Sequence, residues 1–370
     1  MSSLVVLPLV VFWLVGNMVL FFAYQVVIFL AFWPWNLPLY RTLMGQVQTA
    51  WVDVIAVALP PADLVITGQL PTDLTKPAIV LCNHQIDTDW WFLWELARRH
   101  GGGGRLKICL KHELKLVPVF GWGLSLFEFL FVRRNLDADR MHVAEHMASL
   151  GTFPFWMLLF PEGTTITTEA MAKSHRFAKA AGRPTLAHTL LPRTAGLETM
   201  LAATAAVQPD VYDLTMAYPG YGGEVPTNAM GYSRTKDVAV PSMAALIFGR
   251  RGPTTVHMHG CKVAYADVAG REQQFLDHAW AEKDGLMEEF IHHQCFHSKQ
   301  EQNRRVVRPV TSWWGILCLW WSALLAFLAL PVVLVVAIPR FALLGVSTAT
   351  SVAWQWTRRL FGGTSKSKSI

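Results

Sequence analysis

The segment Ala78-Ile79-Val80-Leu81-Cys82 leads directly into Asn83-His84-Gln85-Ile86-Asp87-Thr88-Asp89-Trp90. An apolar run followed by polar turn residues predicts a buried strand that passes through a turn into a helix. His84 and Asp89 have four residues between them, so the carboxylate can fold back onto the imidazole. A carboxylate in that place holds one tautomer of the imidazole and stabilises the imidazolium that forms when His84 takes a proton.

A second polar segment, Phe160-Pro161-Glu162-Gly163-Thr164, comes after another apolar run. Proline and glycine predict a tight turn, and its free backbone N–H groups can bind an anionic ligand. Together the two segments indicate proton abstraction from a hydroxyl group beside a phosphate site.

Between about residues 60 and 265, short β-rich runs alternate with helical patterns. Strands are expected at 64–67, 78–81, 107–110, 129–132, 156–160, 189–191, 213–217 and 255–258, and helices at 90–99, 138–150, 170–181, 197–206 and 273–293. This alternation predicts an α/β domain with a central, mostly buried sheet flanked by helices. Gly101–Gly104 is expected to be a flexible loop tip, and 220–253 is the longest irregular stretch.

Both ends of the chain are strongly apolar. Residues 1–40 contain no Asp, Glu, Lys, Arg or His, and 309–339 and 341–357 are also uncharged. About 20 helical residues cross a hydrocarbon core of about 30 Å, so the first two runs are long enough to span it. We therefore expect an N-terminal membrane anchor and interfacial helix over 1–58, a catalytic domain over 59–300, and C-terminal membrane segments with a basic cytosolic tail over 301–370. The N-terminus lacks the basic region of a cleavable signal peptide, and the number of crossings stays open.

Composition narrows the classes of partner. With 52% apolar residues and 16% charged residues, the chain is more apolar than a soluble globular domain. Its net charge of +6 suits anionic lipid headgroups and other phosphates. The sequence has no basic helix interleaved with aromatic residues, so a nucleic-acid partner is not predicted.

The five cysteines contain no CxxC pair, so reduced thiols facing the cytosol are expected. His292, His293, Cys295 and His297 crowd together without a complementary ligand pair, so no metal is predicted.

Four ordered blocks carry a resemblance to a known family. They are Asn83–Asp89, Phe131-Val132-Arg133-Arg134, Phe160–Thr164 and Leu190-Leu191-Pro192-Arg193-Thr194. In this order they resemble the glycerolipid acyltransferase family, over roughly residues 50 to 300. The segment 111–122 resembles its eukaryotic branch, which acylates lysophosphatidic acid and related lysophospholipids. One departure is Glu128, which stands where the simplest family form has glycine, so the local backbone there is in doubt.

The resemblance implies a role for each residue of the first block. His84 would be the general base, and Asp89 would orient it. Asn83 would donate hydrogen bonds near the substrate, or else serve only as a turn residue that leads into the helix.

The other blocks would bind the substrate. Arg134 offers a planar fork of donors to a phosphate, and the Gly163 backbone and the Thr164 hydroxyl would donate to the same group. Glu162 would bind a glycerol hydroxyl or hold Arg134.

Two lysines of the branch-like segment are further candidates. Lys111 and Lys115 would meet the phosphates of acyl-CoA or of the headgroup, or else form a solvated face.

The implied function is an acyl-CoA-dependent acyltransferase that converts lysophosphatidic acid to phosphatidic acid in phospholipid biosynthesis or remodelling. Acyl-CoA would be a co-substrate, with no bound cofactor. The last residues, Lys366-Ser367-Lys368-Ser369-Ile370, resemble a dilysine retrieval signal, although a solvated basic tail gives the same pattern. The expected location is the endoplasmic reticulum membrane, with the catalytic domain facing the cytosol.

Several alternatives stay open. The acceptor could be lysophosphatidylinositol, lysophosphatidylglycerol or monolysocardiolipin, the donor could be a lipid in a CoA-independent transacylase, or the chain could be a non-catalytic lipid-binding membrane protein. A serine hydrolase fits poorly, because Gly123-Leu124-Ser125-Leu126-Phe127 lacks the final glycine of a nucleophile elbow and Ser125 lies in an expected apolar helix.

Overall fold

The computed structural model describes residues 3–133, 135–224, 246–247, 252–296, 304–310 and four single positions up to 324, without the side chains of 3–13 and 136–138. The chain forms two compact units. One combines residues 1–55 and 110–134 with the C-terminal residues from 312 onward, and the other combines 56–109 with 135–311. The expected linear domain boundaries stay predictions. Most of the C-terminal apolar run and the dilysine-like tail lie outside the described residues.

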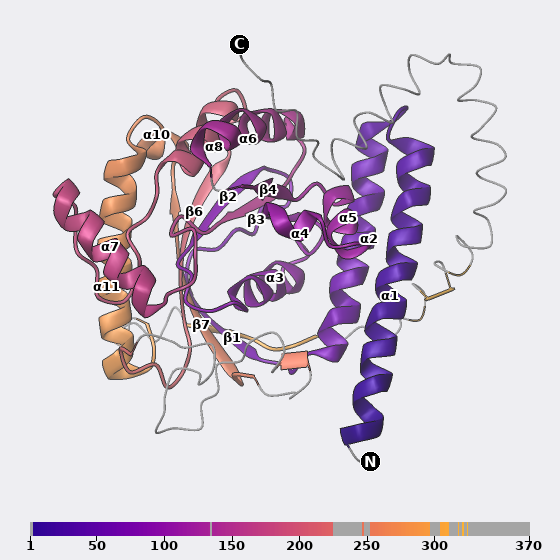
Figure 1. Ribbon diagram of the computed structural model, residues 1–370, viewed down its shortest axis with the longest axis horizontal. Helices are drawn as coiled ribbons and strands as arrows, with labels where there is room; N and C mark the ends of the chain where they lie inside the picture. The colour runs from indigo at the N-terminus through magenta and orange to yellow at the C-terminus, as the bar shows by residue number, and fades with distance from the viewer. Residues whose placement is uncertain are drawn as a thin grey trace, which may run out of the picture. The chain divides into compact units, whose positions relative to one another are not determined.

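A mixed β-sheet forms the centre of the larger unit (Figure 1). Its strands are β1 (Asp63–Gly68), β2 (Ala78–Cys82), β3 (Leu106–Lys111), β5 (Trp156–Leu159), β6 (Asp210–Ala217), β7 (Thr255–Val263) and β8 (Arg305–Val307). They lie side by side in the order β3-β5-β2-β6-β7-β1-β8. Strands β3, β5, β2 and β6 run parallel to one another, whereas β7 pairs antiparallel with β6. All five residues of β2 are buried, as expected for a strand covered on both faces.

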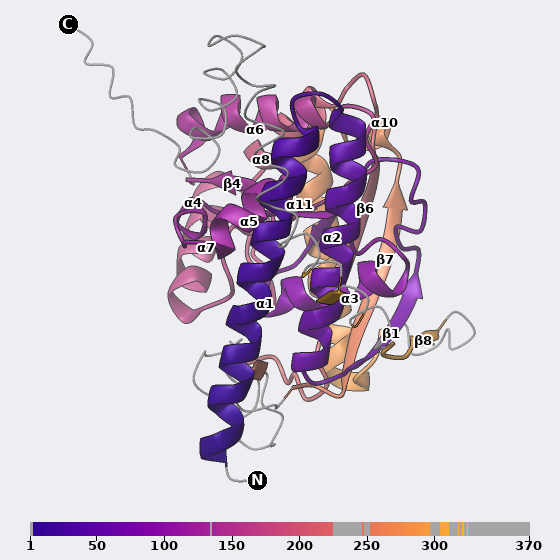
Figure 2. The same ribbon diagram turned by 90° about the vertical axis from the view of Figure 1, so that its right-hand side faces the viewer.

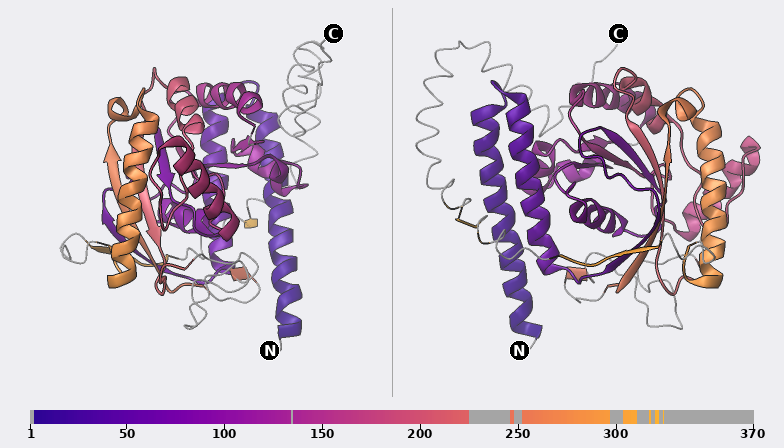
Figure 3. Two further views of the ribbon diagram at one scale, coloured as in Figure 1. Left: turned by 60° about the vertical axis from the view of Figure 1, so that its left-hand side comes forward. Right: turned by 180° about the vertical axis from the view of Figure 1, so that it is seen from behind.

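Helices cover both faces of this sheet. They are α3 (Asp89–Arg99), α6 (Leu136–Leu150), α7 (Thr168–Ala181), α8 (Ala195–Ala203), α10 (Tyr265–Val268) and α11 (Glu272–His293). Figures 1 and 3 show α7 and α11 on one side of the curved sheet and α3 on the other. The predicted α/β class, with a buried central sheet flanked by helices, is confirmed.

The strand predicted at 189–191 is wrong, because the backbone donors there bond to side chains. Thr189 N–H donates to the Asp284 carboxylate, Leu190 N–H to Glu162 and Leu191 N–H to Ser174 Oγ. None of these N–H groups is left for a strand ladder.

The Gly101–Gly104 segment, expected to be a flexible loop tip, is largely buried. Gly102, Gly103 and Gly104 are buried, and a β-carbon on Gly102 would lie only 2.9 Å from the Trp156 ring. Glycine is needed here because a large aromatic ring packs directly against the backbone.

The smaller unit contains a pair of long helices, α1 (Ser3–Phe32) and α2 (Leu37–Ala58), which lie side by side in Figure 2. It also contains α4 (His112–Lys115), α5 (Phe120–Leu126) and β4 (Leu130–Val132). Helix α1 continues through Gly16 and Asn17, and its part from Leu14 to Phe32 is long and apolar enough to cross a membrane.

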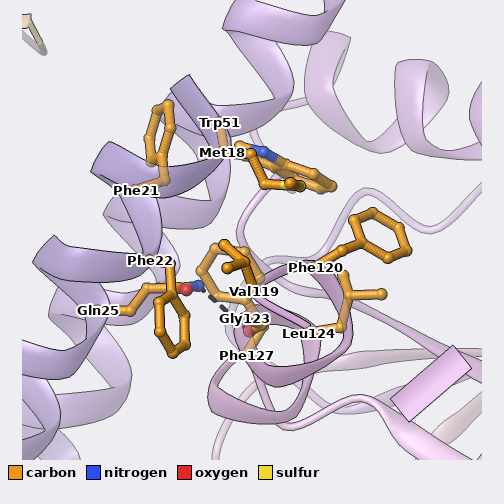
Figure 4. Close-up of a pocket in the computed structure, with 10 residues that line it drawn as sticks. All are labelled: Met18, Phe21, Phe22, Gln25, Trp51, Val119, Phe120, Gly123, Leu124 and Phe127. Atoms are coloured by element: carbon orange, nitrogen blue, oxygen red, sulfur yellow. Dashed lines mark hydrogen bonds between the residues drawn. The ribbon is translucent and has the colours of Figure 1, made fainter. Parts of the chain in front are cut away.

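A small, mostly apolar pocket lies where α1, α2 and α5 meet (Figure 4). Gln25 is the polar side chain in its lining, and its amide donates to Gly123 O at 3.2 Å. The predicted helix around Ser125 is confirmed, and the Ser125 hydroxyl donates to Gly121 O within that helix. The bond is an ordinary intrahelical one, so Ser125 has no nucleophile elbow around it.

Glu128 has the backbone conformation of a glycine, with φ of +61°. Its buried carboxylate forms two hydrogen bonds of 3.0 Å with Arg41 of α2. The backbone at Glu128 therefore has a left-handed conformation, which costs roughly 1–2 kcal/mol in a residue with a side chain.

Candidate active site

Three neighbouring parallel strands end at the same edge of the sheet. The segment Asn83–Asp89 follows β2, the loop Phe160–Thr164 follows β5, and Tyr218 follows β6. In open α/β sheets, ligands bind at the carboxyl ends of the strands. The order β5-β2-β6 brings these segments together, although they lie far apart in the sequence.

His84 and Asp89 form a hydrogen-bonded pair. His84 Nδ1 lies 2.9 Å from Asp89 Oδ2, which also accepts from Gln85 N–H at 2.6 Å and Ile86 N–H at 3.0 Å. Because a carboxylate oxygen faces Nδ1, that nitrogen carries the proton and the lone pair is on Nε2.

The other Asp89 oxygen bonds to a residue far along the chain. Tyr218 donates its hydroxyl to Asp89 Oδ1 at 2.6 Å, and the Asp89 side chain is fully buried. Four donors thus hold this carboxylate in one orientation. A charged group at the first residue of α3 also interacts favourably with the dipole of that helix.

The imidazole is fixed on one side and accessible on the other. Its ring stacks on Phe160 with centroids 4.1 Å apart and planes at 19°. The side chain is 17% exposed, and no group in the described part of the chain bonds to Nε2. The ring is therefore positioned to take a proton from a ligand at Nε2.

Asn83 anchors the turn to the neighbouring strand. Its amide donates to Met216 O at 3.0 Å and accepts from Met216 N–H at 2.8 Å. Because the side chain is completely buried and bonded to β6, Asn83 does not point toward a ligand.

Glu162 points into the protein. It is 2% exposed, and its carboxylate accepts from His84 N–H at 3.2 Å, Trp280 Nε1–H at 3.1 Å and Leu190 N–H at 3.3 Å. Burial raises the pKa of Glu162 from 4.5 to about 8. Glu162 therefore links the segments Asn83–Asp89 and Phe160–Thr164, and its oxygens accept from protein donors rather than from a glycerol hydroxyl.

Helix α11 forms hydrogen bonds to two segments beside the site, the loop that carries Glu162 and the segment 187–189. Besides the Trp280 bond to Glu162, the Asp284 carboxylate accepts from the backbone N–H groups of Ala187, His188 and Thr189. Lys283 is 1% exposed and forms an ion pair of 2.7 Å with Asp213 of β6.

The other residues that the sequence predicted for substrate binding lie in several parts of the structure. Gly163 and Thr164 lie in the loop after β5, next to Glu162. Gly163 has a φ of +75°, and its N–H donates to Phe160 O at 3.0 Å, so this N–H closes the turn and is not the free phosphate donor that was expected. Lys111 and Lys115 belong to the smaller unit, where Lys111 is exposed and Lys115 is buried, so the solvated-face alternative is wrong for Lys115. Arg134 lies outside the described residues.

No group of three or more metal-ligand side chains occurs among the residues that the structure describes. His297, the last of the His/Cys cluster considered above, is outside that set. Cys82 is buried next to Asn83, and burial raises the pKa of its thiol well above the usual value. A thiol of this kind is a poor nucleophile.

Two family models match this chain in sequence. The model described as acyltransferase matches residues 63–218, and the model described as acyltransferase C-terminus matches residues 246–321. The chain belongs to the acyltransferase family. The first match contains the His84–Asp89 pair and the Phe160–Thr164 loop, and the second contains α11.

Known relatives carry related names. A 1-acyl-sn-glycerol-3-phosphate acyltransferase 2 from Brassica napus is 28% identical over 84% of this chain and 77% of its own length. A lysocardiolipin acyltransferase 1 from Danio rerio is 28% identical over 68% of this chain and 62% of its own length. Among solved structures, the 1-acyl-sn-glycerophosphate acyltransferase PlsC from Thermotoga maritima matches with a TM-score of 0.38 and 14% identity, over 74% of this chain and 97% of that one. The acyltransferase family includes enzymes for lysophosphatidic acid and for other lysophospholipids.

Tyr218, Trp280 and Phe160 are parts of the site to which the sequence assigned no role. Tyr218-Pro219-Gly220 resembles the eukaryotic branch, and that resemblance was the available signal for Tyr218. Trp280 lies just before Glu282-Lys283-Asp284, which also resembles that branch, and Phe160 begins the third block. Which atoms they contact depends on the strand order, so their roles could not be read from local patterns.

Proposed function

We propose that this acyltransferase moves an acyl group from acyl-CoA to the free hydroxyl of a lysophospholipid, with lysophosphatidic acid as the acceptor and phosphatidic acid as the product. The observation that carries the proposal is the His84 imidazole, which Asp89 holds at Nδ1 and which has Nε2 available to a ligand. The names of the relatives support the choice of a lysophospholipid acceptor.

His84 acts as general base and then as general acid. Nε2 takes the proton from the acceptor hydroxyl while the hydroxyl oxygen attacks the thioester carbonyl carbon. The tetrahedral intermediate then expels the CoA sulfur, which receives the proton from the imidazolium. Asp89 stabilises the imidazolium between the two transfers. No acyl-enzyme is needed, and no described serine or cysteine is paired with His84.

The proposed setting is a membrane. Helix α1, with its apolar part from Leu14 to Phe32, would anchor the enzyme in the endoplasmic reticulum with the catalytic domain facing the cytosol. A membrane-seated enzyme can take both lipid substrates directly from the bilayer.

Release of free CoA from oleoyl-CoA tests the proposal. Detergent-purified protein is assayed against lysophosphatidic acid, lysophosphatidylinositol, lysophosphatidylglycerol and monolysocardiolipin, with His84→Ala alongside. General-base catalysis is worth about 10²–10⁴-fold, so the variant should lose activity by that factor. It should stay folded with a lowered melting temperature, because Asp89 loses one of its four donors. Preference for another lysophospholipid would change the acceptor. No release with any of them, from folded protein, would refute acyl-CoA-dependent transfer.

A further inference from the structure

Arg193 lies against the Phe160–Thr164 loop, although it belongs to the fourth sequence block. A β-carbon built on Gly163 would lie 3.5 Å from Arg193 Nε and 3.6 Å from Arg193 Cζ. The Arg193 backbone N–H donates to Pro161 O at 2.9 Å. The Arg193 guanidinium group therefore lies beside the loop that follows β5 and carries Glu162.

The charge of Arg193 is not neutralised within the described part of the chain. No carboxylate there lies within ion-pair distance of its guanidinium, no hydrogen bond is formed by that group, and the residue is exposed. The nearby Arg183 differs, because its guanidinium bonds to both oxygens of Asp277 and donates to Pro192 O. Arg183 therefore has a structural role, whereas the guanidinium donors of Arg193 are available to an anion.

The segment that carries Arg193 is well anchored. The backbone N–H groups of 187–189 donate to Asp284, that of Leu190 to Glu162, and that of Leu191 to Ser174 Oγ. A cation on an anchored backbone binds an anion with a smaller loss of conformational entropy than one on a free loop.

We propose that Arg193 binds the phosphate group of the acyl acceptor and so places the acceptor hydroxyl at His84. The inference rests on the proposed function and adds the phosphate-binding residue. Gly163 is adjacent to Glu162, which itself bonds to the His84 backbone, so the phosphate and the base are held by one connected structure.

The acceptor suits a phosphate site on the loop that bonds to the His84 backbone better than the donor does. In lysophosphatidic acid with its 2-hydroxyl free, two carbons separate that hydroxyl from the phosphoester oxygen. In acyl-CoA, the whole pantetheine arm separates the thioester from the phosphates. A phosphate close to the reacting hydroxyl is therefore the acceptor's phosphate.

Binding is measured first, without turnover. Full-length Arg193→Gln, Arg193→Lys and wild-type protein in detergent are titrated calorimetrically with a short-chain lysophosphatidic acid below its micelle concentration. A hydrogen bond to a charged group is worth roughly 1.5–3 kcal/mol, so Kd should rise about 10- to 100-fold in Arg193→Gln. Lysine keeps the charge but not the fork and should recover part of the loss.

A matched control removes an exposed arginine elsewhere. Arg271, just before α11, is exposed, and Arg271→Gln lowers the net charge equally. Its Kd should equal that of the wild type, and all variants should melt at the wild-type temperature, because the side chain of Arg193 forms no bond within the described chain.

Steady-state kinetics then distinguish an effect on binding of the acceptor from an effect on binding of the donor. Arg193→Gln should raise KM for lysophosphatidic acid and leave KM for oleoyl-CoA unchanged. A wild-type Kd in Arg193→Gln, or a raised KM for oleoyl-CoA alone, would overturn the inference. If wild-type protein released no CoA with any acceptor, the proposed function would fail, and the titration would still decide whether Arg193 binds the phosphate.

Discussion

Replacement of Glu162 by glutamine tests how the two catalytic segments are joined. The carboxylate accepts three N–H donors and is almost fully buried. The glutamine oxygen can replace Oε1, which accepts from His84 and Trp280, while the amide nitrogen then faces Leu190 N–H. The variant keeps the shape of a neutral glutamic acid and cannot ionise.

The magnitude follows from the pKa of Glu162, which burial raises from 4.5 to about 8. Because the folded state binds the proton more tightly than the unfolded state, the stabilisation is fully present below about pH 4.5. It is lost as the pH rises through about 8. At about 1.4 kcal/mol per pH unit, the upper limit of the loss is about 5 kcal/mol.

Thermal melts of wild type and Glu162→Gln between pH 5 and 9 measure this effect. Near pH 5 we expect Glu162→Gln to melt below the wild type, because its amide nitrogen leaves Leu190 N–H without an acceptor. As the pH rises the wild type alone should lose stability, so Glu162→Gln should be the more stable protein at pH 9. Glu145→Gln, at an exposed glutamate of α6, should follow the wild type. Parallel curves for wild type and Glu162→Gln would refute the reasoning and show that the three N–H donors keep the carboxylate ionised.

Three further substitutions have defined outcomes. Tyr218→Phe removes a donor from the buried Asp89 and should lower the free energy of unfolding by about 1.5–3 kcal/mol, measured by denaturant melts. Lys283→Met leaves Asp213 without its ion-pair partner and should cost about 3–5 kcal/mol, whereas the pair Lys283→Met with Asp213→Leu should recover much of it in the same melts. Gly163→Ala forces a side chain into a backbone with φ of +75° and should cost about 1–2 kcal/mol, seen as a lower Tm; an unchanged Tm would show that the loop relaxes.

Local patterns in the sequence were sufficient for the individual elements of the larger unit. The apolar run of β2, the turn at His84 and the helix from Asp89 were predicted because each depends on residues near one another in the chain. The same holds for the pairing of His84 with Asp89, since the turn between them is short. The predicted strand at 189–191 failed because its backbone donors bond to side chains, including Asp284, about 95 residues away.

The sequence by itself thus determined the α/β class, the strand–turn–helix that carries His84 and Asp89, and the family. Only the tertiary structure decided that Tyr218 donates to Asp89 across 129 positions, and that Trp280 donates to Glu162 across 118. It also turned Glu162 inward and placed Arg193 beside Gly163. The physical reason is that these contacts depend on the strand order β5-β2-β6 and on the docking of α11, which arise from packing over the whole sheet and leave no periodic signal in any local segment.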